Sequence, residues 1–228
     1  MIDIKQKTFF GRRKGKGMSK AKEDLISSEM PKFEIKLPKS GTIDFNKLFD
    51  FTPSKLIFEI GYGDGDHIIQ MALKNPDVGF IGTEVFVNGN VSILKKILEN
   101  NITNIRIFPD DVNLLFQFIK DETFSRIFVL YPDPWPKNRN ENRRMINKTN
   151  LTLFHKFLTK GGNLFVASDH PIYIPWVLFC MKDSNLFEWL ATKSSDFVNP
   201  PNDWETTKYE QKALKELRKP IYLSFVKK

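Results

Sequence analysis

The sequence predicts an α/β fold built on a doubly wound, mostly parallel sheet of seven strands, with an antiparallel strand at the C-terminal edge. Two observations lead to this prediction. Short apolar runs that are typical of buried strands alternate with stretches of helical periodicity over most of the chain. In addition, a glycine-rich turn at residues 61–65 follows the first of these runs, and ligands of such sheets bind beyond the strand ends.

The predicted strands are short apolar runs bounded by Gly, Pro, Asn or Asp. Five of them precede helical stretches, at residues 55–60, 79–85, 104–108, 126–131 and 163–167. A strand-like pattern after Asn185 and another at residues 221–225 complete the sheet. We expect these last two strands to pair antiparallel at one edge of the sheet.

Stretches of helical periodicity fill the segments between the strands. The expected helices cover residues 66–74, 88–100, a short stretch from 111, 141–159, a segment opened by Pro171, and 207–217. We expect Gly161 and Gly162 to close the helix that begins at residue 141, and Pro200 and Pro201 to mark a loop.

The chain divides into a basic arm with a connector, residues 1–50, and one large domain, residues 51–228. Residues 5–22 contain no acidic residue, and the glycines among them disfavour a stable helix. Their basic residues are Lys5, Lys7, Arg12, Arg13, Lys14, Lys16, Lys20 and Lys22. We expect this arm to lie along the phosphates of a nucleic acid; a solvated tail and a mitochondrial targeting segment are the alternatives.

The composition of the chain indicates the class of binding partner and the cellular compartment. The net charge of +8 and the pI near 9.4 favour a polyanionic partner, a nucleic acid before a membrane, over a merely basic protein. Cys180, the one cysteine, stands in an apolar run and predicts a buried structural thiol in a reducing cytoplasm. Three histidines without ligand spacing predict no metal site. Without an apolar run of ~20 residues or an apolar signal region, we expect a cytoplasmic protein that neither spans a membrane nor is secreted.

The glycine-rich turn holds Gly61, Gly63 and Gly65, which allow a ligand to approach the backbone closely. The spacing differs from the dinucleotide fingerprint, because Asp66 stands where its third glycine would be. Asp64 and Asp66 would repel a pyrophosphate, and the Lys-Ser/Thr pair of a phosphate loop is absent. These features disfavour both NAD and ATP.

Carboxylates stand at the ends of three successive predicted strands: Glu59, Glu84 and Asp111. Glu84 is placed to accept hydrogen bonds from ribose hydroxyls, Glu59 to face an ammonium group, and Asp111 to accept from an adenine amino group. A ligand with ribose, adenine and a positive charge but no phosphate is S-adenosylmethionine. The alternative is that the three residues are incidental helix caps.

Residues 131–137 (YPDPWPK) form the densest motif in the chain. Three prolines at alternate positions force a stiff, extended turn at the end of a buried strand. The turn holds Asp133, Trp135 and Lys137 in a nearly fixed relation, which suits a planar polar ligand such as a nucleotide base. The alternative is an ordinary turn with Trp135 packed over it.

These motifs resemble the bacterial tRNA (guanine-N7-)-methyltransferase family, the TrmB type. The resemblance rests on residues 58–65 (FEIGYGDG), 82–85 (GTEV), Asp111, 131–137, Arg143, Arg144, 167–169 (ASD) and 207–210 (TKYE). The basic lead-in at residues 10–16 is similar as well, and the match runs in order over nearly the whole chain. Tyr131, Val112 and Tyr209 stand where the family usually has Phe, Ala and Phe, and none of these differences removes a polar group.

The resemblance implies a Rossmann-like class I methyltransferase domain that transfers a methyl group from S-adenosylmethionine to N7 of a guanine in the tRNA variable loop. It implies that the cofactor is bound by Glu59, Gly61, Gly63, Glu84, Asp111 and Asp133. It implies that the substrate is bound by Lys137, Asp169, Thr207, Lys208, Tyr209 and Glu210. The implied partner is tRNA, with no metal and no obligate protein partner.

Guanine N7 carries a lone pair and no proton, so the reaction requires alignment more than a general base. We therefore expect Asp133 to act as the catalytic residue by orienting the guanine and stabilising the positive charge that develops on it. Phosphates are expected to contact the arm and the basic residues after the turn, unless these form a solvated helix face. Those residues are Lys137, Arg139, Arg143, Arg144 and Lys148.

Several assignments remain open on the sequence. Trp135 either stacks on a base or packs under the turn. Asp169 either binds guanine or caps the helix opened by Pro171, and Thr207 with Glu210 has the spacing of a capping box. The rival functions are a methyltransferase of another substrate and a non-catalytic RNA-binding protein.

Overall fold

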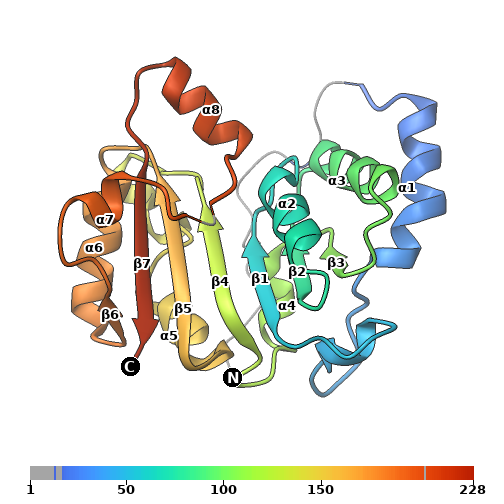
Figure 1. Ribbon diagram of the computed structural model, residues 1–228, viewed down its shortest axis with the longest axis horizontal. Coiled ribbons are helices and arrows are strands. Elements are labelled where there is room, and N and C mark those ends of the chain that lie inside the picture. The colour runs from blue at the N-terminus through green and yellow to red at the C-terminus, as the bar shows by residue number, and fades with distance from the viewer. Residues whose placement is uncertain (1–12, 14–16, 203) are drawn as a thin grey trace. The chain divides into compact units, whose positions relative to one another are not determined.

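The computed structural model describes residue 13, residues 17–202 and residues 204–228. In these residues, seven strands form one mixed sheet and helices alternate with the strands along the chain, which confirms the predicted α/β fold class (Figure 1). The chain consists of two compact units, Met1–Lys120 and Asp121–Lys228. No helix within the described ranges is both long and apolar enough to cross a membrane.

The first unit contains three parallel strands in the order β3-β2-β1. Its elements are α1 (Lys20–Phe33), η1 (Phe45–Leu48), β1 (Leu56–Ile60), α2 (Asp66–Lys74), β2 (Gly79–Thr83), α3 (Val87–Glu99), β3 (Ile105–Phe108) and α4 (Val112–Phe116). Every residue of β1 and β2 is buried, as expected for parallel strands covered on both faces. The parallel register brings the carboxyl ends of the three strands to one edge, where the glycine-rich turn begins.

The second unit contains four strands in the order β4-β5-β7-β6. Its elements are β4 (Phe124–Leu130), η2 (Asn138–Arg143), α5 (Lys148–Phe157), β5 (Leu158–Ser168), α6 (Tyr173–Ser184), β6 (Phe187–Trp189), α7 (Ser195–Val198), α8 (Lys208–Lys215) and β7 (Ile221–Lys227). β4 and β5 are parallel, whereas β7 runs antiparallel to both β5 and β6. The predicted antiparallel pairing of the last two strands is therefore confirmed, with β6 outermost.

The helix predicted over residues 141–159 is wrong in its extent. It is replaced by η2, an extended residue at Arg144, and α5, which starts where the Asn147 side chain accepts a hydrogen bond from the Asn150 amide at 2.9 Å. Gly161 and Gly162 do not close it, because β5 begins directly at Leu158 and runs through both glycines. The register of β5 on β4 shifts there, and Gly161 has a φ of +67°. The glycines thus serve a bulge in a strand, not a helix end.

Helix α1 was not predicted, and the expectation of no helix over residues 5–22 is wrong for its last three residues. α1 begins at Lys20 and packs against α3 and β3 in the first unit, with Met30 buried. This tertiary contact outweighs the weak amphipathic pattern of the segment. Of the other basic arm residues, Lys5, Lys7, Arg12, Lys14 and Lys16 lie outside the described residues.

Candidate active site

The glycine-rich turn leaves β1 in left-handed backbone conformations, with φ values of 74° at Gly61, 57° at Gly63 and 81° at Gly65. The Gly61 amide donates to the Thr83 carbonyl at 2.8 Å, so the turn starts as a continuation of the β1–β2 pair. A Cβ built on Gly65 would collide with Ile93 at 2.8 Å, whereas one on Gly61 would meet nothing within 4 Å. The backbone at Gly61 therefore faces open space, as a closely bound ligand requires.

Glu84, at the end of β2, holds the turn in place. Its Oε2 accepts a hydrogen bond from the Gly63 amide and its Oε1 accepts one from the Phe86 amide, each at 2.9 Å. Helix α3 packs tightly onto the same turn, since a Cβ on Gly89 would lie 2.4 Å from the Gly63 carbonyl oxygen. The structure thus brings two of the predicted cofactor residues, Gly63 and Glu84, into direct contact.

Glu59 is buried, with only 3% of its surface exposed, and its Oε2 lies 2.6 Å from Nδ1 of the equally buried His67. This pair joins the end of β1 to the first turn of α2 and fixes the carboxylate. His67 could not be predicted as a site residue, because nothing in a single histidine on a helix indicates which strand residue it contacts. Tyr62 is buried close by; burial first, then the charges of Glu84 and Glu59, raise the pKa of its hydroxyl, which donates to Asn90.

Asp111 follows β3 and caps α4. Its Oδ1 accepts from the Asn113 amide at 3.0 Å, so the helix-cap alternative for this residue holds as a fact of the structure. The neighbouring Asp110 pairs with the arm residue Arg13 at 2.8 Å, and the Arg13 carbonyl accepts from the Val87 amide at 2.9 Å. Arg13 therefore lies beside the segments that follow β2 and β3.

The Pro-Asp-Pro-Trp turn, residues 131–137, is held in place by the buried Arg144. The guanidinium of Arg144 donates to the carbonyls of Pro134 and Trp135 at 3.0 Å each and stacks 4.4 Å from the centre of the Trp176 ring. Arg144 is only 3% exposed, so it supports the turn from the interior, and the prediction that it contacts phosphates is wrong. The half-buried Trp135 ring has the guanidinium of Arg143 5.0 Å over one face.

Two residues of the turn have strained backbone conformations, with φ values of 48° at Tyr131 and 41° at Trp135. Left-handed conformations of bulky residues cost about 1–3 kcal/mol each and persist only where the surroundings enforce them. The Tyr131 amide continues the β4–β5 pairing by donating to the Ala167 carbonyl at 2.8 Å, and Arg144 fixes the other end of the turn. Between these anchors, Asp133 reaches the surface, yet desolvation by the surrounding atoms raises the pKa of its carboxyl group.

Replacing Arg144 by Lys is expected to lower the free energy of unfolding by about 2 kcal/mol. A lysine cannot donate to both carbonyls from one planar group, and hydrogen bonds to charged groups contribute about 1.5–3 kcal/mol. Urea denaturation measures the difference. Arg143→Lys is the matched control, because Arg143 is exposed and a cation–π contact at such a site contributes about 0.5–1 kcal/mol. Equal losses in the two variants would contradict the supporting role of Arg144.

Asp169 follows β5 and forms an ion pair with Arg218, the residue that follows the C-terminal end of α8 by a few positions. The predicted alternative of a cap on the next helix is wrong. Within the described part of the chain, no side chain caps α6, which begins at Tyr173, and the turn before it is closed by His170. The Nδ1 of His170 accepts from the Ile172 amide at 3.3 Å, and its carbonyl accepts from the Tyr173 amide at 3.0 Å. The Asp169 side chain keeps 11% of its surface exposed, so it is oriented by Arg218 at the rim of the strand ends.

Thr207 caps α8, and its Oγ1 accepts from the Glu210 amide at 3.0 Å, which confirms half of the predicted capping box. The other half is wrong, because the Glu210 carboxylate does not reach back to Thr207. It is buried and accepts hydrogen bonds from Trp204 Nε1 at 2.6 Å and from the Tyr222 hydroxyl at 2.7 Å. Glu210 also lies near Tyr131, the first residue of the Pro-Asp-Pro-Trp turn. Burial first, and then the charge of Glu210, raise the pKa of the Tyr131 hydroxyl.

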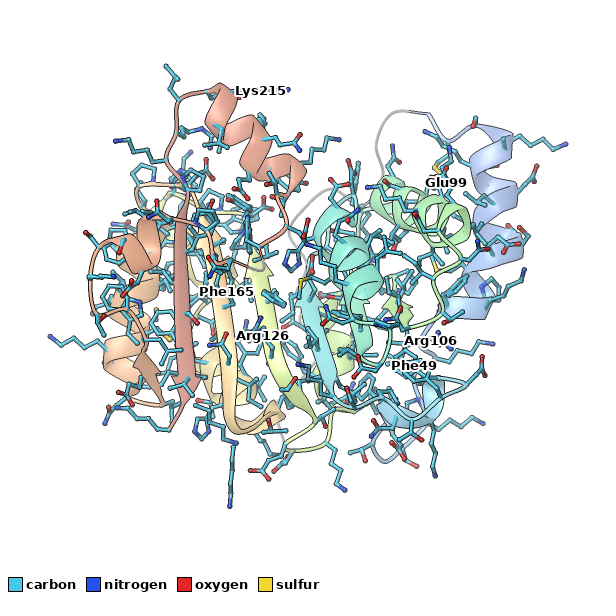
Figure 2. All side chains as sticks on the ribbon, in the orientation of Figure 1. Phe49, Glu99, Arg106, Arg126, Phe165 and Lys215 are labelled. Atoms are coloured by element: carbon cyan, nitrogen blue, oxygen red, sulfur yellow. The ribbon has the colours of Figure 1, made fainter. Side chains whose placement is uncertain are left out.

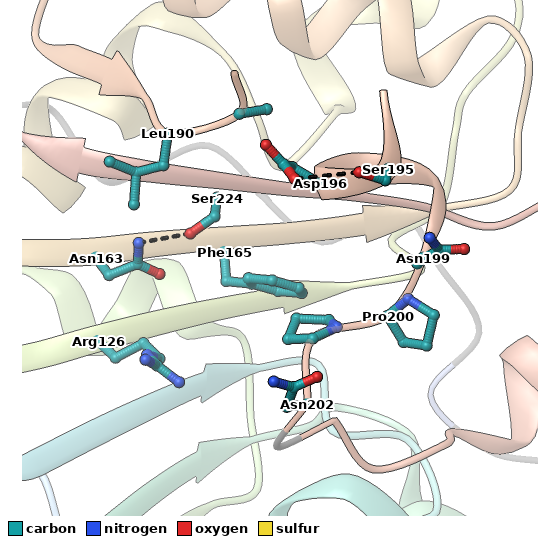
Figure 3. A pocket seen from close by; sticks show the side chains of 12 residues that line it. Arg126, Asn163, Phe165, Leu190, Ser195, Asp196, Asn199, Pro200, Asn202 and Ser224 are labelled. Atoms are coloured by element: carbon teal, nitrogen blue, oxygen red, sulfur yellow. Dashed lines mark hydrogen bonds between the residues drawn. The ribbon is translucent and has the colours of Figure 1, made fainter. Parts of the chain in front are cut away.

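A cavity of about 340 Å³ lies elsewhere in the second unit, over the middle of its sheet. Figure 3 shows Phe165 and Pro200 against this cavity, with the Asn163 amide donating to Ser224 at 2.8 Å. None of the predicted site residues lines it. Within the described ranges, no three His, Cys, Asp or Glu side chains are grouped so as to hold a metal ion.

The family model described as "Putative methyltransferase" matches residues 53–223. The chain is 41% identical to a tRNA (guanine-N(7)-)-methyltransferase of Rhizobium johnstonii over 96% of this chain and 94% of that protein. It is 40% identical to the protein of the same name from Rhodospirillum rubrum, over 95% and 86% of the two chains.

Among solved structures, the 16S rRNA methyltransferase KamB has the same fold, with a TM-score of 0.57, 11% sequence identity, and coverage of 82% of this chain and 95% of that one. A likeness at this level of identity concerns the fold alone. The identity with the curated relatives is far higher and extends over nearly the full length of both chains. The chain therefore belongs to the tRNA (guanine-N(7)-)-methyltransferase family.

Proposed function

We propose that this protein transfers the methyl group of S-adenosylmethionine to N7 of a guanine in the variable loop of tRNA. The observation that carries this proposal is the sequence identity of 41% and 40%, over nearly the full length of the chain, with relatives named for that reaction. The polar groups at the ends of β1, β2 and β3 support it from the side of the methyl donor, because they suit ribose, adenine and a cation and disfavour a pyrophosphate.

Five residues of the first unit are proposed to bind S-adenosylmethionine: Glu59, Gly61, Gly63, Glu84 and Asp111. The open space at Gly61 and the turn locked by Glu84 support backbone contact with the ligand and acceptance from its ribose hydroxyls. The Glu59–His67 pair and the capping role of Asp111 support preorganisation, since both carboxylates are fixed by their own hydrogen bonds.

In the reaction, the lone pair of guanine N7 forms the new N–C bond while the S–C bond of the sulfonium breaks, so the positive charge moves from sulfur to the guanine ring. We assign Asp133 to this step and to the cofactor side of the site. An ionised carboxylate beside the ring stabilises the charge more in the transition state than in the ground state. The strained turn, anchored at Tyr131 and by Arg144, supports a fixed carboxylate position.

The second unit is proposed to bind the tRNA. Asp169, held by Arg218, would accept from the guanine edge, and Lys137, Thr207, Lys208, Tyr209 and Glu210 complete the proposed substrate set. Within that set Glu210 acts indirectly, because its carboxylate is engaged with Trp204 and Tyr222. Phosphate contacts are assigned to the exposed Arg139 and Arg143 and to the basic arm.

We propose that residues 1–50 form an arm and connector, that residues 51–228 form the methyltransferase domain, and that the protein acts in the cytoplasm. The reaction is tested by incubating the protein with labelled S-adenosylmethionine and unmodified tRNA, followed by chemical cleavage at 7-methylguanine. Label in tRNA and cleavage in the variable loop are expected. Label at another nucleotide, or no label in RNA, would overturn the proposed function.

A further inference from the structure

Helix α8 has one acidic side chain, and that side chain is turned inward. Glu210 is 3% exposed and bonded to Trp204 and Tyr222, and Ala213, on the same side of the helix, is fully buried. The next acidic residue, Glu216, lies after the helix and pairs with Arg218 through Oε2 at 2.6 Å. Glu210 is thus the one carboxylate within α8, and it lies on the buried side of the helix.

The three lysines of α8 all lie on this outward face. Lys208, Lys212 and Lys215 are spaced by four and then three residues, which places them in one stripe along the helix, opposite Glu210 and Ala213. All three are exposed, and Figure 2 marks Lys215 on the last turn. Tyr209, 53% exposed, flanks the stripe. From Lys208 to Lys215 the stripe extends about 10 Å, at ~1.5 Å per residue.

Both ends of α8 are fastened to the body of the second unit. At the N-terminal end, Thr207 caps the helix and Glu210 anchors it to Tyr222. At the C-terminal end, Leu217 adopts a left-handed φ of 56° and the Arg218 amide donates to the Ala213 carbonyl at 2.8 Å, which is the Schellman arrangement. The side chain of Arg218 then pairs with Asp169. The lysine stripe is thus held at a fixed position relative to Asp169, because the lysines lie on α8 and Arg218, which follows α8 closely, pairs with Asp169.

We propose that the lysine stripe of α8 is an RNA-binding surface, which contacts backbone phosphates of the tRNA whose guanine is bound near Asp169. This inference rests on the proposed function and extends it to a further phosphate-binding element, separate from the N-terminal arm and from Arg139 and Arg143. Lysine ammonium groups on a preorganised helix suit phosphates as point charges, and the contacts release counterions. Tyr209 offers a ring beside the stripe on which a base can stack.

The test compares two triple variants of the full chain. Lys208→Gln/Lys212→Gln/Lys215→Gln removes the stripe while keeping good helix formers. Lys36→Gln/Lys39→Gln/Lys55→Gln removes the same charge from exposed lysines outside α8 and serves as the control. The Kd for unmodified tRNA is measured between 50 and 200 mM salt. We expect the stripe variant to bind about tenfold more weakly at low salt and its log–log salt slope to fall by about 2–3, at ~0.7–0.9 per lost phosphate contact.

A slope and Kd equal to those of the control variant would overturn the proposal. Binding is the readout, so the result stands apart from the methylation assay: wild-type protein that binds tRNA without methylating it would reject the proposed function and leave the stripe intact as an RNA-binding surface. Thermal denaturation and the Kd for S-adenosylmethionine are expected to match the wild type in both variants. A stripe variant that loses either of them would attribute the effect to the helix fold and overturn the assignment.

Discussion

Asp133→Asn is expected to lower kcat by about 100-fold or more while leaving the Kd for tRNA within a few-fold of the wild type. The substitution keeps the shape of the side chain and removes the charge that stabilises the developing guanine cation, and single preorganised electrostatic groups of this kind contribute about 10²–10³ in kcat. Single-turnover methylation with saturating tRNA and S-adenosylmethionine measures the effect. Asp183→Asn, at an exposed carboxylate of the same unit, is the control and should retain full activity.

The pH dependence gives a second readout of the same residue. Desolvation raises the pKa of Asp133, and the reaction needs the ionised form, so the wild-type kcat should rise with pH through that raised pKa. Asp133→Asn should lack this limb. Near wild-type turnover, or an unchanged acidic limb in the variant, would reject the catalytic role.

The free energy of unfolding should depend on pH in the opposite direction to kcat. Between the usual carboxyl pKa and the raised pKa, the folded protein binds more protons than the unfolded chain, so the contribution of Asp133 to the free energy of unfolding falls as pH rises through this window. Above the raised pKa the loss is complete. Asp133→Asn removes it, so the variant should be no less stable than the wild type in thermal denaturation at pH 7. Loss of activity with unchanged or higher stability separates catalysis from folding.

Deletion of residues 1–16 is expected to weaken tRNA binding by about 100-fold at low salt and to reduce the salt slope by up to about 5. The segment holds six cationic side chains, at Lys5, Lys7, Arg12, Arg13, Lys14 and Lys16, and the deletion stops before α1 so that the buried Met30 contact is kept. Filter binding over a range of salt concentrations measures both quantities.

Arg13 needs a separate control, because it is tied to the first unit through Asp110 and the Val87 amide. Arg13→Ala in the full chain should lower the tRNA affinity only slightly. A matched variant with Gln at Lys5, Lys7, Lys14 and Lys16 keeps the chain length and should reproduce most of the deletion effect. A salt slope that survives the deletion unchanged would exclude the arm as a phosphate-binding segment.

The order of strands and helices could be predicted well from the sequence, because it depends on local periodicity. Strand β1, helix α2 and strand β2 begin and end within two residues of the expected positions, since fully apolar runs between glycines and prolines leave few alternatives. The segments that failed are those where packing overrides local signals. Helix α1 is stabilised by its contact with α3. Gly161 and Gly162 have the pattern of a helix end, but they belong to a strand bulge.

The main features of the candidate site could also be predicted from the sequence. They are the glycines where the backbone is left-handed, the carboxylates at successive strand ends, and the proline-rich turn around Asp133. These features follow from local backbone geometry and from position along a strand. Only the tertiary structure decided which neighbours engage them. It paired Glu59 with His67 and Asp169 with Arg218, turned Glu210 inward to Tyr222, and buried Arg144 under the turn. Such partners come from distant parts of the chain, and because burial and pairing depend on three-dimensional proximity, no local pattern specifies them.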